Sequence, residues 1–368
     1  MENPRFVETG SNSFFGEYLY DLVVPPNHFL RHLNQIIDWD RFTRKLLKLY
    51  KGGGMVGRPP FDPAMILKME LIAYLYKLTE RQVEVYVNEN MPAKYFVGLA
   101  ADQSAPDHST LTVFRERLVK RGRQKIFADL LEEIVQIALS KGICFGAIQI
   151  VDSVHSIANV NTDKDHHRQG KGKGPRDPDA RWGVKHTRKV QTEAGKTEEQ
   201  VEYFYGYKAH VSLNAENGLM TSLEVTSGEA YDGKHFTSLV GHDLKQSLPL
   251  ETYTADKAYD DGENHYNLEV RGLHSAIRLK KTRTDQKDDA KQVWISLHQT
   301  PQYQQGLKER YKIERKFGEA KQGHALGRCR YLGRWGFTVQ AFFTAIMLNL
   351  KRLVKLLAGV GFKTQVVA

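Results

Sequence analysis

Three acidic residues on different kinds of predicted local structure suggest one kind of chemistry. Asp152 ends the apolar run 147–152 and Asp256 ends the similar run 252–256, and short β-branched runs of this kind are typical of buried strands. Each aspartate is therefore expected at the carboxyl end of a strand. Glu314 lies in a stretch with helical character. Carboxylate oxygens suit Mg²⁺ or Mn²⁺, and two such ions about 3.5–4 Å apart can drive an in-line displacement at phosphorus. The three residues together predict a two-metal phosphoryl-transfer site.

Two cations flank the glutamate on one predicted helix face. At about 100° per residue, Arg310, Glu314 and Lys321 fall within about 40° of one another. An arginine can hold two phosphate oxygens in a fork, so we expect Arg310 and Lys321 to hold phosphates near the metals. Lys257, beside the second aspartate, and Lys208 are further candidates for this task.

Other carboxylates fit the set less well. Glu319 lies five residues after Glu314, which turns it away from that face. The remaining candidates are typical of helix starts or flank a predicted strand end: Asp260, Asp261, Glu224, Glu229 and Asp232. His210 is interpreted as a supporting residue of the predicted sheet.

The spacing Arg-x3-Glu-x6-Lys resembles the signature of DDE transposases of bacterial insertion sequences, in the IS4/IS5 superfamily and nearest in pattern to the IS1182-like group. Further motifs follow in the order of that family, at residues 57–63, 78–82, 106–111, 177–182, 205–210 and 255–257. The chain departs from the family pattern at Leu307, Ala258 and Tyr231. The resemblance covers the chain from about Phe29 to Val354.

This resemblance implies an enzyme that binds the terminal inverted repeats of its element, hydrolyses DNA strands there and joins the freed 3′-hydroxyl ends to target DNA. Asp152, Asp256 and Glu314 would be the metal ligands, for two Mg²⁺ ions that Mn²⁺ can replace. The expected partners are DNA and a second copy of the chain in the DNA complex, with no membrane and no small-molecule cofactor. Two alternatives stay open: a catalytically decayed DNA-binding protein, and a ribonuclease H-like nuclease without strand transfer.

Composition agrees with a DNA-handling protein. The 368 residues carry a net charge of +10, which favours a polyanionic partner. Cys144 and Cys329 have no paired spacing, so a reduced, cytoplasmic, nucleoid-associated protein without structural zinc is expected. The longest uncharged stretch, 335–350, is too short and too polar to span a bilayer.

The fold is predicted as α/β, with a ribonuclease H-like core preceded by an all-α domain. Residues 1–145 show helical patterns, with helices expected from Pro63, after the cap Thr79 and after Asp107. This domain either binds the DNA ends or only braces the core. The mixed five-stranded sheet of the core, within 146–334, is expected from strands at 147–152, 203–213, 219–225, 252–256 and 276–279. A C-terminal helix and tail, 335–368, is expected to pack on the core.

The segment 163–189 is the least globular part of the chain. It is rich in glycine and cations and lacks apolar periodicity, so we predict a mobile loop that orders on DNA phosphates through Lys171 and Lys173. A solvated surface loop is the alternative. Trp182, beside Arg181, could stack on an unpaired base or anchor the loop.

Overall fold

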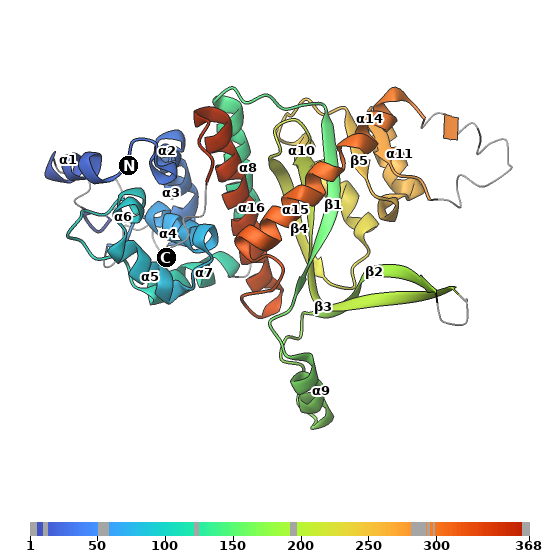
Figure 1. The fold of residues 1–368 in the computed structure, drawn as a ribbon, viewed down its shortest axis with the longest axis horizontal. Helices are drawn as coiled ribbons and strands as arrows, with labels where there is room; N and C mark the ends of the chain where they lie inside the picture. The colour runs from blue at the N-terminus through green and yellow to red at the C-terminus, as the bar shows by residue number, and fades with distance from the viewer. Residues whose placement is uncertain are drawn as a thin grey trace. The chain divides into compact units, whose positions relative to one another are not determined.

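The computed structural model describes residues 6–9, 14–50, 59–120, 125–191, 197–280, 292, 295–296 and 299–362, and Figure 1 shows its helices and strands. Positions 57 and 58 of the first quoted motif lie outside the described residues. The chain forms two compact units. The first comprises Met1–Ile143, Gly323–Ala325 and Phe342–Ala368, and the second Cys144–Gln322 and Leu326–Ala341.

The first unit is helical, and its helices begin where the sequence places caps. Asp62 caps the helix that starts at Pro63, Thr79 forms a capping box with Gln82, and Asp107 accepts from the backbone of Thr110. The helices are α1 (Phe14–Val23), α2 (Phe29–Ile36), α3 (Asp40–Leu46), η2 (Leu47–Leu49), α4 (Pro63–Tyr76), α5 (Glu80–Glu89), α6 (Met91–Val97), α7 (His108–Val119) and α8 (Lys125–Ser140). Among the described helices, none is long and apolar enough to cross a membrane.

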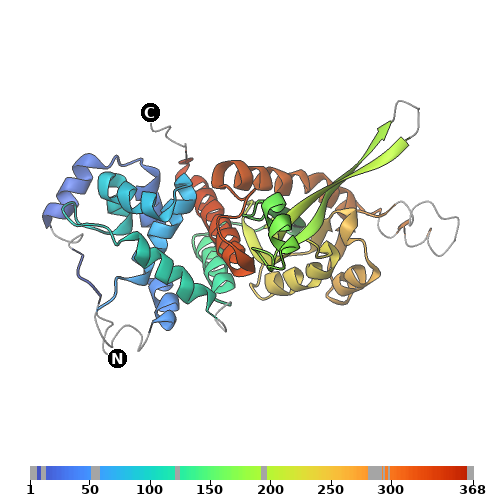
Figure 2. The same ribbon diagram turned by 90° about the horizontal axis from the view of Figure 1, so that it is seen from below.

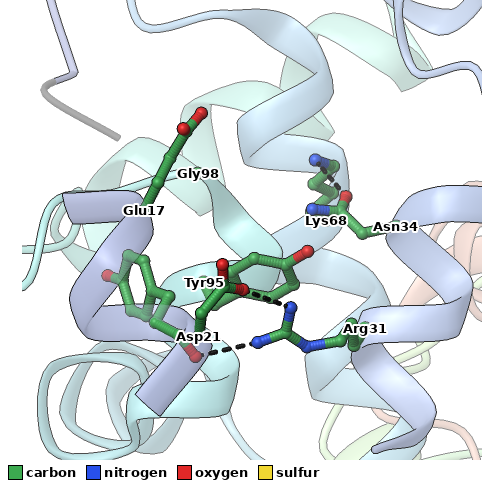
Figure 3. Close-up of a pocket in the computed structure, with 8 residues that line it drawn as sticks. Glu17, Asp21, Arg31, Asn34, Lys68, Tyr95 and Gly98 are labelled. Carbon is green, nitrogen blue, oxygen red and sulfur yellow. Dashed lines mark hydrogen bonds and ion pairs between the residues drawn. The ribbon is translucent and has the colours of Figure 1, made fainter. Parts of the chain in front are cut away.

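Helix α4 is buried on all sides, and this buries a lysine within the first unit. The Lys68 ammonium donates to Asn34 Oδ1 over 2.8 Å and lies over the rings of Trp39 and Phe96, at 4.8 and 5.4 Å. Burial lowers the pKa of Lys68 to about 7. The lysine lines a cavity of about 400 Å³, which Figure 3 shows together with Arg31 and its bond to Asp21.

The lysine makes the stability of the protein depend on pH. Its pKa is about 7 in the folded protein and 10.5 in the reference state, so between these values the unfolded chain binds the additional proton. The free energy of unfolding should therefore rise with pH across this window, by at most about 1.4 kcal/mol per pH unit. We expect Lys68→Met to remove this slope and to stabilise the protein most at pH 7. Urea unfolding at pH 7, 8.5 and 10 measures the free energy of unfolding, and the exposed Lys48→Met is the control. If the free energy of unfolding changes equally with pH in both variants, the prediction is contradicted.

The second unit is built on a mixed sheet. In the described residues the strands are β1 (Ile148–Ile157), β2 (Arg181–Gln191), β3 (Thr197–Asn214), β4 (Met220–Ser227), β5 (Thr252–Ala255) and β6 (His274–Ile277). Strand β1 pairs antiparallel with β3 and parallel with β5, β6 pairs parallel with β5, and β4 pairs antiparallel with β3. The resulting order β4-β3-β1-β5-β6 is that of the ribonuclease H-like fold, which confirms the predicted fold class.

Helices connect the strands of the second unit, and two of them lie on opposite faces of its sheet. From residue 162 onward the described helices are α9 (Thr162–Gly170), η4 (Asp232–His235), α10 (Phe236–Leu244), η5 (Lys257–Tyr259), α11 (Gly262–Val270), α14 (Pro301–Glu309), α15 (Tyr311–His324) and α16 (Gly333–Ala358). Tyr253 of β5 contacts Phe236 and Asp243 of α10. The next residue, Thr254, faces Gly306 of α14, where an added Cβ would lie 3.3 Å from the threonine Cβ. Adjacent strand residues point to opposite faces, so α10 and α14 lie on opposite sides, as Figures 1 and 2 show.

The predicted loop at 163–189 is wrong for most of its length. Residues 162–170 form α9, which stands off the sheet in Figure 1, and β2 begins at Arg181. The helix has no apolar face, and the interactions that stabilise it lie at its two ends. Asn161 caps it, acidic residues lie in its first turn and His167 and Arg168 in its last. Strand β2 pairs with the first half of β3, so the two form a ribbon beyond the core of the sheet (Figure 2).

The C-terminal segment also differs from its expectation. Residues 333–341 of α16 belong to the second unit and its later residues to the first. From residue 342 onward the aromatic side chains pack among helices of the first unit. Phe342 lies beside Phe127, and Phe343 beside Tyr74. The described part of the segment 335–368 is therefore divided between the two units.

Candidate active site

The sheet register places the two aspartates side by side. Val151 of β1 pairs with Ala255 of β5, and Asp152 and Asp256 directly follow these residues. Neighbouring strands lie about 4.8 Å apart and in-register residues point to the same face. Asp256 follows its strand as expected. Asp152 does not, because β1 continues to Ile157 through its pairing with β3. The first aspartate thus lies where β5 ends and β1 continues.

Several charged side chains lie close to Asp152, where β5 ends. Burial raises the pKa of the Asp152 carboxyl to about 7, and the charges of Asp256 and Asp232 act in the same direction. Arg310 opposes them. Its guanidinium Nη1 lies 3.7 Å from Asp256 Oδ1, its side chain is 13% exposed, and its Nε is buried without a hydrogen-bond partner in the described structure. The arginine therefore has one donor that the described structure leaves unused.

Helix α15 carries the glutamate past the two aspartates. Arg310, just before the helix, lies at Asp256, whereas Lys321 near its other end places Nζ 3.5 Å from Nε2 of His155. His155 follows Asp152 by three residues on β1. Glu314 lies between these two anchor points and is exposed. The helix therefore runs over the β5–β1 boundary with Glu314 in between.

The three carboxylates do not form one group of metal ligands in the described structure. In the part of the chain that the structure describes, no group of three His, Cys, Asp or Glu side chains is placed to hold a metal ion. The structure brings Asp152 and Asp256 together, and Glu314 remains outside coordination distance. The donor set still fits Mg²⁺, because it consists of hard carboxylate oxygens and because a cation would offset the repulsion from Asp256 and Asp232, which adds to the burial that raises the pKa of Asp152.

The expected phosphate-binding residues have different surroundings. Lys257 is exposed directly after Asp256, and Lys171 and Lys173 are exposed after α9. Arg181 is also exposed and donates to Pro178 O over 2.6 Å.

Trp182 and Lys208 differ in how open they are to a ligand. Trp182 is 57% exposed and lies beside the ring of Tyr205, at 5.4 Å. Lys208 is instead engaged within the protein by Asp232, at 2.8 Å, and by Ala230 O, at 2.9 Å. Of these two residues, the structure leaves only Trp182 open to solvent.

Asp232 is the residue at this site that the sequence interpretation set aside. It lies on η4, and it accepts hydrogen bonds from both Ser153 and Lys208, at 2.8 Å each. His210, expected in a supporting role, is fully buried, with Nε2 2.9 Å from Thr226 Oγ1 and its ring stacked on His235. No local sequence signal separates Asp232 from the other acids near the end of β4, since its partners come from β1 and β3.

Solved structures with some likeness to this chain include two groups of transposase complexes. A piggyBac transposase synaptic complex with hairpin DNA is 12% identical, with 99% of this chain and 80% of that chain covered and a TM-score of 0.40. A pre-cleavage Mos1 transpososome is 11% identical, with 84% and 82% covered and a TM-score of 0.21. A Mos1 mariner paired end complex with Mn is 12% identical, with 95% and 93% covered and a TM-score of 0.21. These scores are too low to carry an argument about function.

The family matches are more direct. Residues 162–350 match the transposase DDE domain, and residues 18–117 match the transposase domain DUF772. The first match includes Asp256 and Glu314 and begins ten residues after Asp152, whose assignment therefore depends on its register with Asp256. Because this match alone spans more than half of the 368 residues, the chain belongs to the DDE transposase family, with the domain pair typical of IS1182-like insertion sequences.

Proposed function

We propose that this transposase binds the inverted-repeat ends of its own insertion sequence, hydrolyses DNA strands there and joins the 3′-hydroxyl ends to target DNA. The observation that carries the proposal is the register of β1 and β5. It sets Asp152 beside Asp256, with the Arg310 guanidinium at the pair and Glu314 one helical turn further on. A carboxylate pair with an adjacent cation suits a phosphodiester held together with divalent metal ions.

Asp152, Asp256 and Glu314 would hold two Mg²⁺ ions. When bound, the ions supply Lewis acidity and neutralise charge at the scissile phosphate. The protein itself contributes position and electrostatics. Arg310 places its guanidinium beside Asp256, where its charge can attract a phosphate oxygen. Lys321, two turns after Glu314, adds positive charge on the same side of α15. A water and then the freed 3′-hydroxyl are the nucleophiles, so no covalent protein–DNA intermediate is required.

The DNA would follow the basic segment around α9. Every residue from 161 to 176 is exposed except Asp165, and a helix that is polar all round is suited to a polyanionic partner. Asp165 accepts from Gln169 Nε2 and from the backbone of Arg176, at 3.0 and 2.8 Å, so it holds the helix to the following turn. Lys171 and Lys173 are exposed in the segment that leads to β2, where the exposed ring of Trp182 offers a surface for a base.

The test is a reaction with the purified full-length chain, labelled DNA that carries the element's own ends, and a supercoiled target plasmid. We expect end cleavage and joined products in Mg²⁺ and in Mn²⁺, and neither in EDTA. DNA binding should persist in all three conditions. Nicked ends without joined products would instead indicate a nuclease. Binding without cleavage in either metal would indicate a decayed, DNA-binding transposase.

A further inference from the structure

Asp232 ties three elements together behind the metal-binding aspartate. Its side chain is 19% exposed, and each of its two oxygens has a different donor. Oδ2 accepts from the Ser153 hydroxyl and Oδ1 from the Lys208 ammonium, both at 2.8 Å. Ser153 follows Asp152 on β1, Lys208 lies on β3, and Asp232 lies on η4. One carboxylate therefore links the strand of the first aspartate to the strand beside it.

The hydrogen bond from Ser153 to Asp232 acts on the orientation of Asp152. The Asp152 carboxylate Oδ1 accepts from the backbone N–H of Ser153 over 2.8 Å. That N–H belongs to the residue whose hydroxyl Asp232 holds. The conformation of Ser153 therefore determines which oxygen of Asp152 is engaged by the protein and which remains available to a ligand.

The hydrogen bond from Lys208 to Asp232 holds the lysine ammonium close to the site. The lysine side chain is 14% exposed, and its ammonium has two acceptors, Asp232 Oδ1 and the carbonyl oxygen of Ala230. A buried ammonium that loses its carboxylate is costly, so it moves toward another acid or loses its proton. Lys208 pairs with His155 and Asp152 pairs with Val211, so the side chains of Lys208 and Asp152 point to opposite faces of the sheet. While it stays charged, an ammonium without Asp232 would be an uncompensated positive charge near the metal site, which opposes the binding of a cation.

Buried Tyr259 lies near the same acids. Burial raises the pKa of its hydroxyl, and the charges of Asp152, Asp232 and Asp256 act in the same direction. Asp232 is thus a third carboxylate at the aspartate pair, but one whose oxygens are already used by the protein. This arrangement fits a residue that acts through its neighbours.

We propose that Asp232 is a positioning residue of the metal site, which orients Asp152 through Ser153 and compensates the positive charge of Lys208. The proposal rests on the proposed function, since it takes Asp152 as a metal ligand. It also assigns Lys208 to the protein framework in place of the DNA-phosphate role expected from the sequence.

The test measures Mn²⁺ affinity by electron paramagnetic resonance on the full chain without DNA. Outer partners of metal ligands typically change metal affinity by about 10–100-fold, so Asp232→Asn should weaken Mn²⁺ binding by at least about tenfold. Cleavage at saturating metal should fall much less than the affinity does. The double variant Asp232→Asn/Lys208→Met should recover most of the affinity, because it removes the uncompensated positive charge. Glu229→Gln, three residues earlier and exposed, is the matched control.

The outcomes separate the two proposals. Wild-type protein that neither binds Mn²⁺ nor cleaves DNA overturns the proposed function and this inference with it. With a wild type that binds Mn²⁺, equal affinity in Asp232→Asn overturns the inference alone. If the double variant binds Mn²⁺ no more tightly than the single one, the role proposed for Lys208 is overturned. If Asp232→Asn does not fold, Ser153→Ala tests the role of the Ser153 hydrogen bond. We expect a weaker Mn²⁺ affinity, and an unchanged affinity would contradict that role.

Discussion

Replacing Glu314 by glutamine is expected to slow metal-dependent strand cleavage by at least about 10³-fold, which corresponds to about 4 kcal/mol of lost transition-state stabilisation. Glutamine keeps the size of the side chain and removes the charge that would attract the metal ions. The side chain is exposed, so its exchange leaves the packing of α15 intact. Binding of the labelled transposon end should therefore stay within about twofold of wild type. Single-turnover cleavage in Mg²⁺, with binding followed in parallel, measures both quantities.

The same helix provides the control for this variant. Glu319 lies five residues later, with an oxygen 3.3 Å from Lys316 Nζ, and points away from the face that carries Glu314. Glu319→Gln should cleave at nearly the wild-type rate. The assignment of the third ligand fails if Glu314→Gln retains full activity. Loss of DNA binding together with cleavage in Glu314→Gln would also contradict it, because that result would place the glutamate in end recognition.

The sequence predicted the elements that carry the metal ligands, and the reasons are local. The runs before Asp152 and Asp256 are apolar because both lie on central, buried strands, so their composition alone indicates strands. Helix starts at Pro63 and after Thr79 were predictable for the same reason, since the cap residues make hydrogen bonds within three positions. What these patterns cannot give is the register that sets Asp152 beside Asp256, because the pairing residues are about 100 positions apart.

The errors arose where structure depends on distant partners or on charge. Strand β2 pairs with β3, and its side chains at Arg181, Trp182, Val184 and Lys185 are exposed, so the sequence gives no apolar alternation. Helix α9 is held by its cap and by Asp165, neither of which changes the hydrophobic pattern. The DNA contact of Lys208 stays a prediction, and the carboxylate that engages it in the structure, Asp232, comes from beyond the next strand. Long-range polar pairs of this kind leave no periodic signal in the sequence.

Gly206→Ala is expected to produce the largest loss of stability among the substitutions considered. Gly206 lies on β3 between Ile157 of β1 and Arg181 of β2. A Cβ at this position would overlap the carbonyl oxygen of Ser156 and would lie 2.9 Å from the backbone nitrogen of Ala158. Both are main-chain atoms of the paired strand, so relief requires β1 and β3 to separate. Overpacking of this kind costs about 1–3 kcal/mol or more.

Separation of these strands also reaches the active site, because β1 carries Asp152 five residues before Ile157. We therefore expect Gly206→Ala to lower the thermal unfolding temperature by several degrees, with about 4–8 °C per kcal/mol in a small domain and less in a larger one. Cleavage activity should fall with it. Gly241→Ala in α10 is the matched control, since no atom lies within 4 Å of the added Cβ and alanine favours a helix. An unchanged unfolding temperature in Gly206→Ala would show that β1 and β3 tolerate a wider spacing, and the close approach of the two strands would then not be what requires glycine at this position.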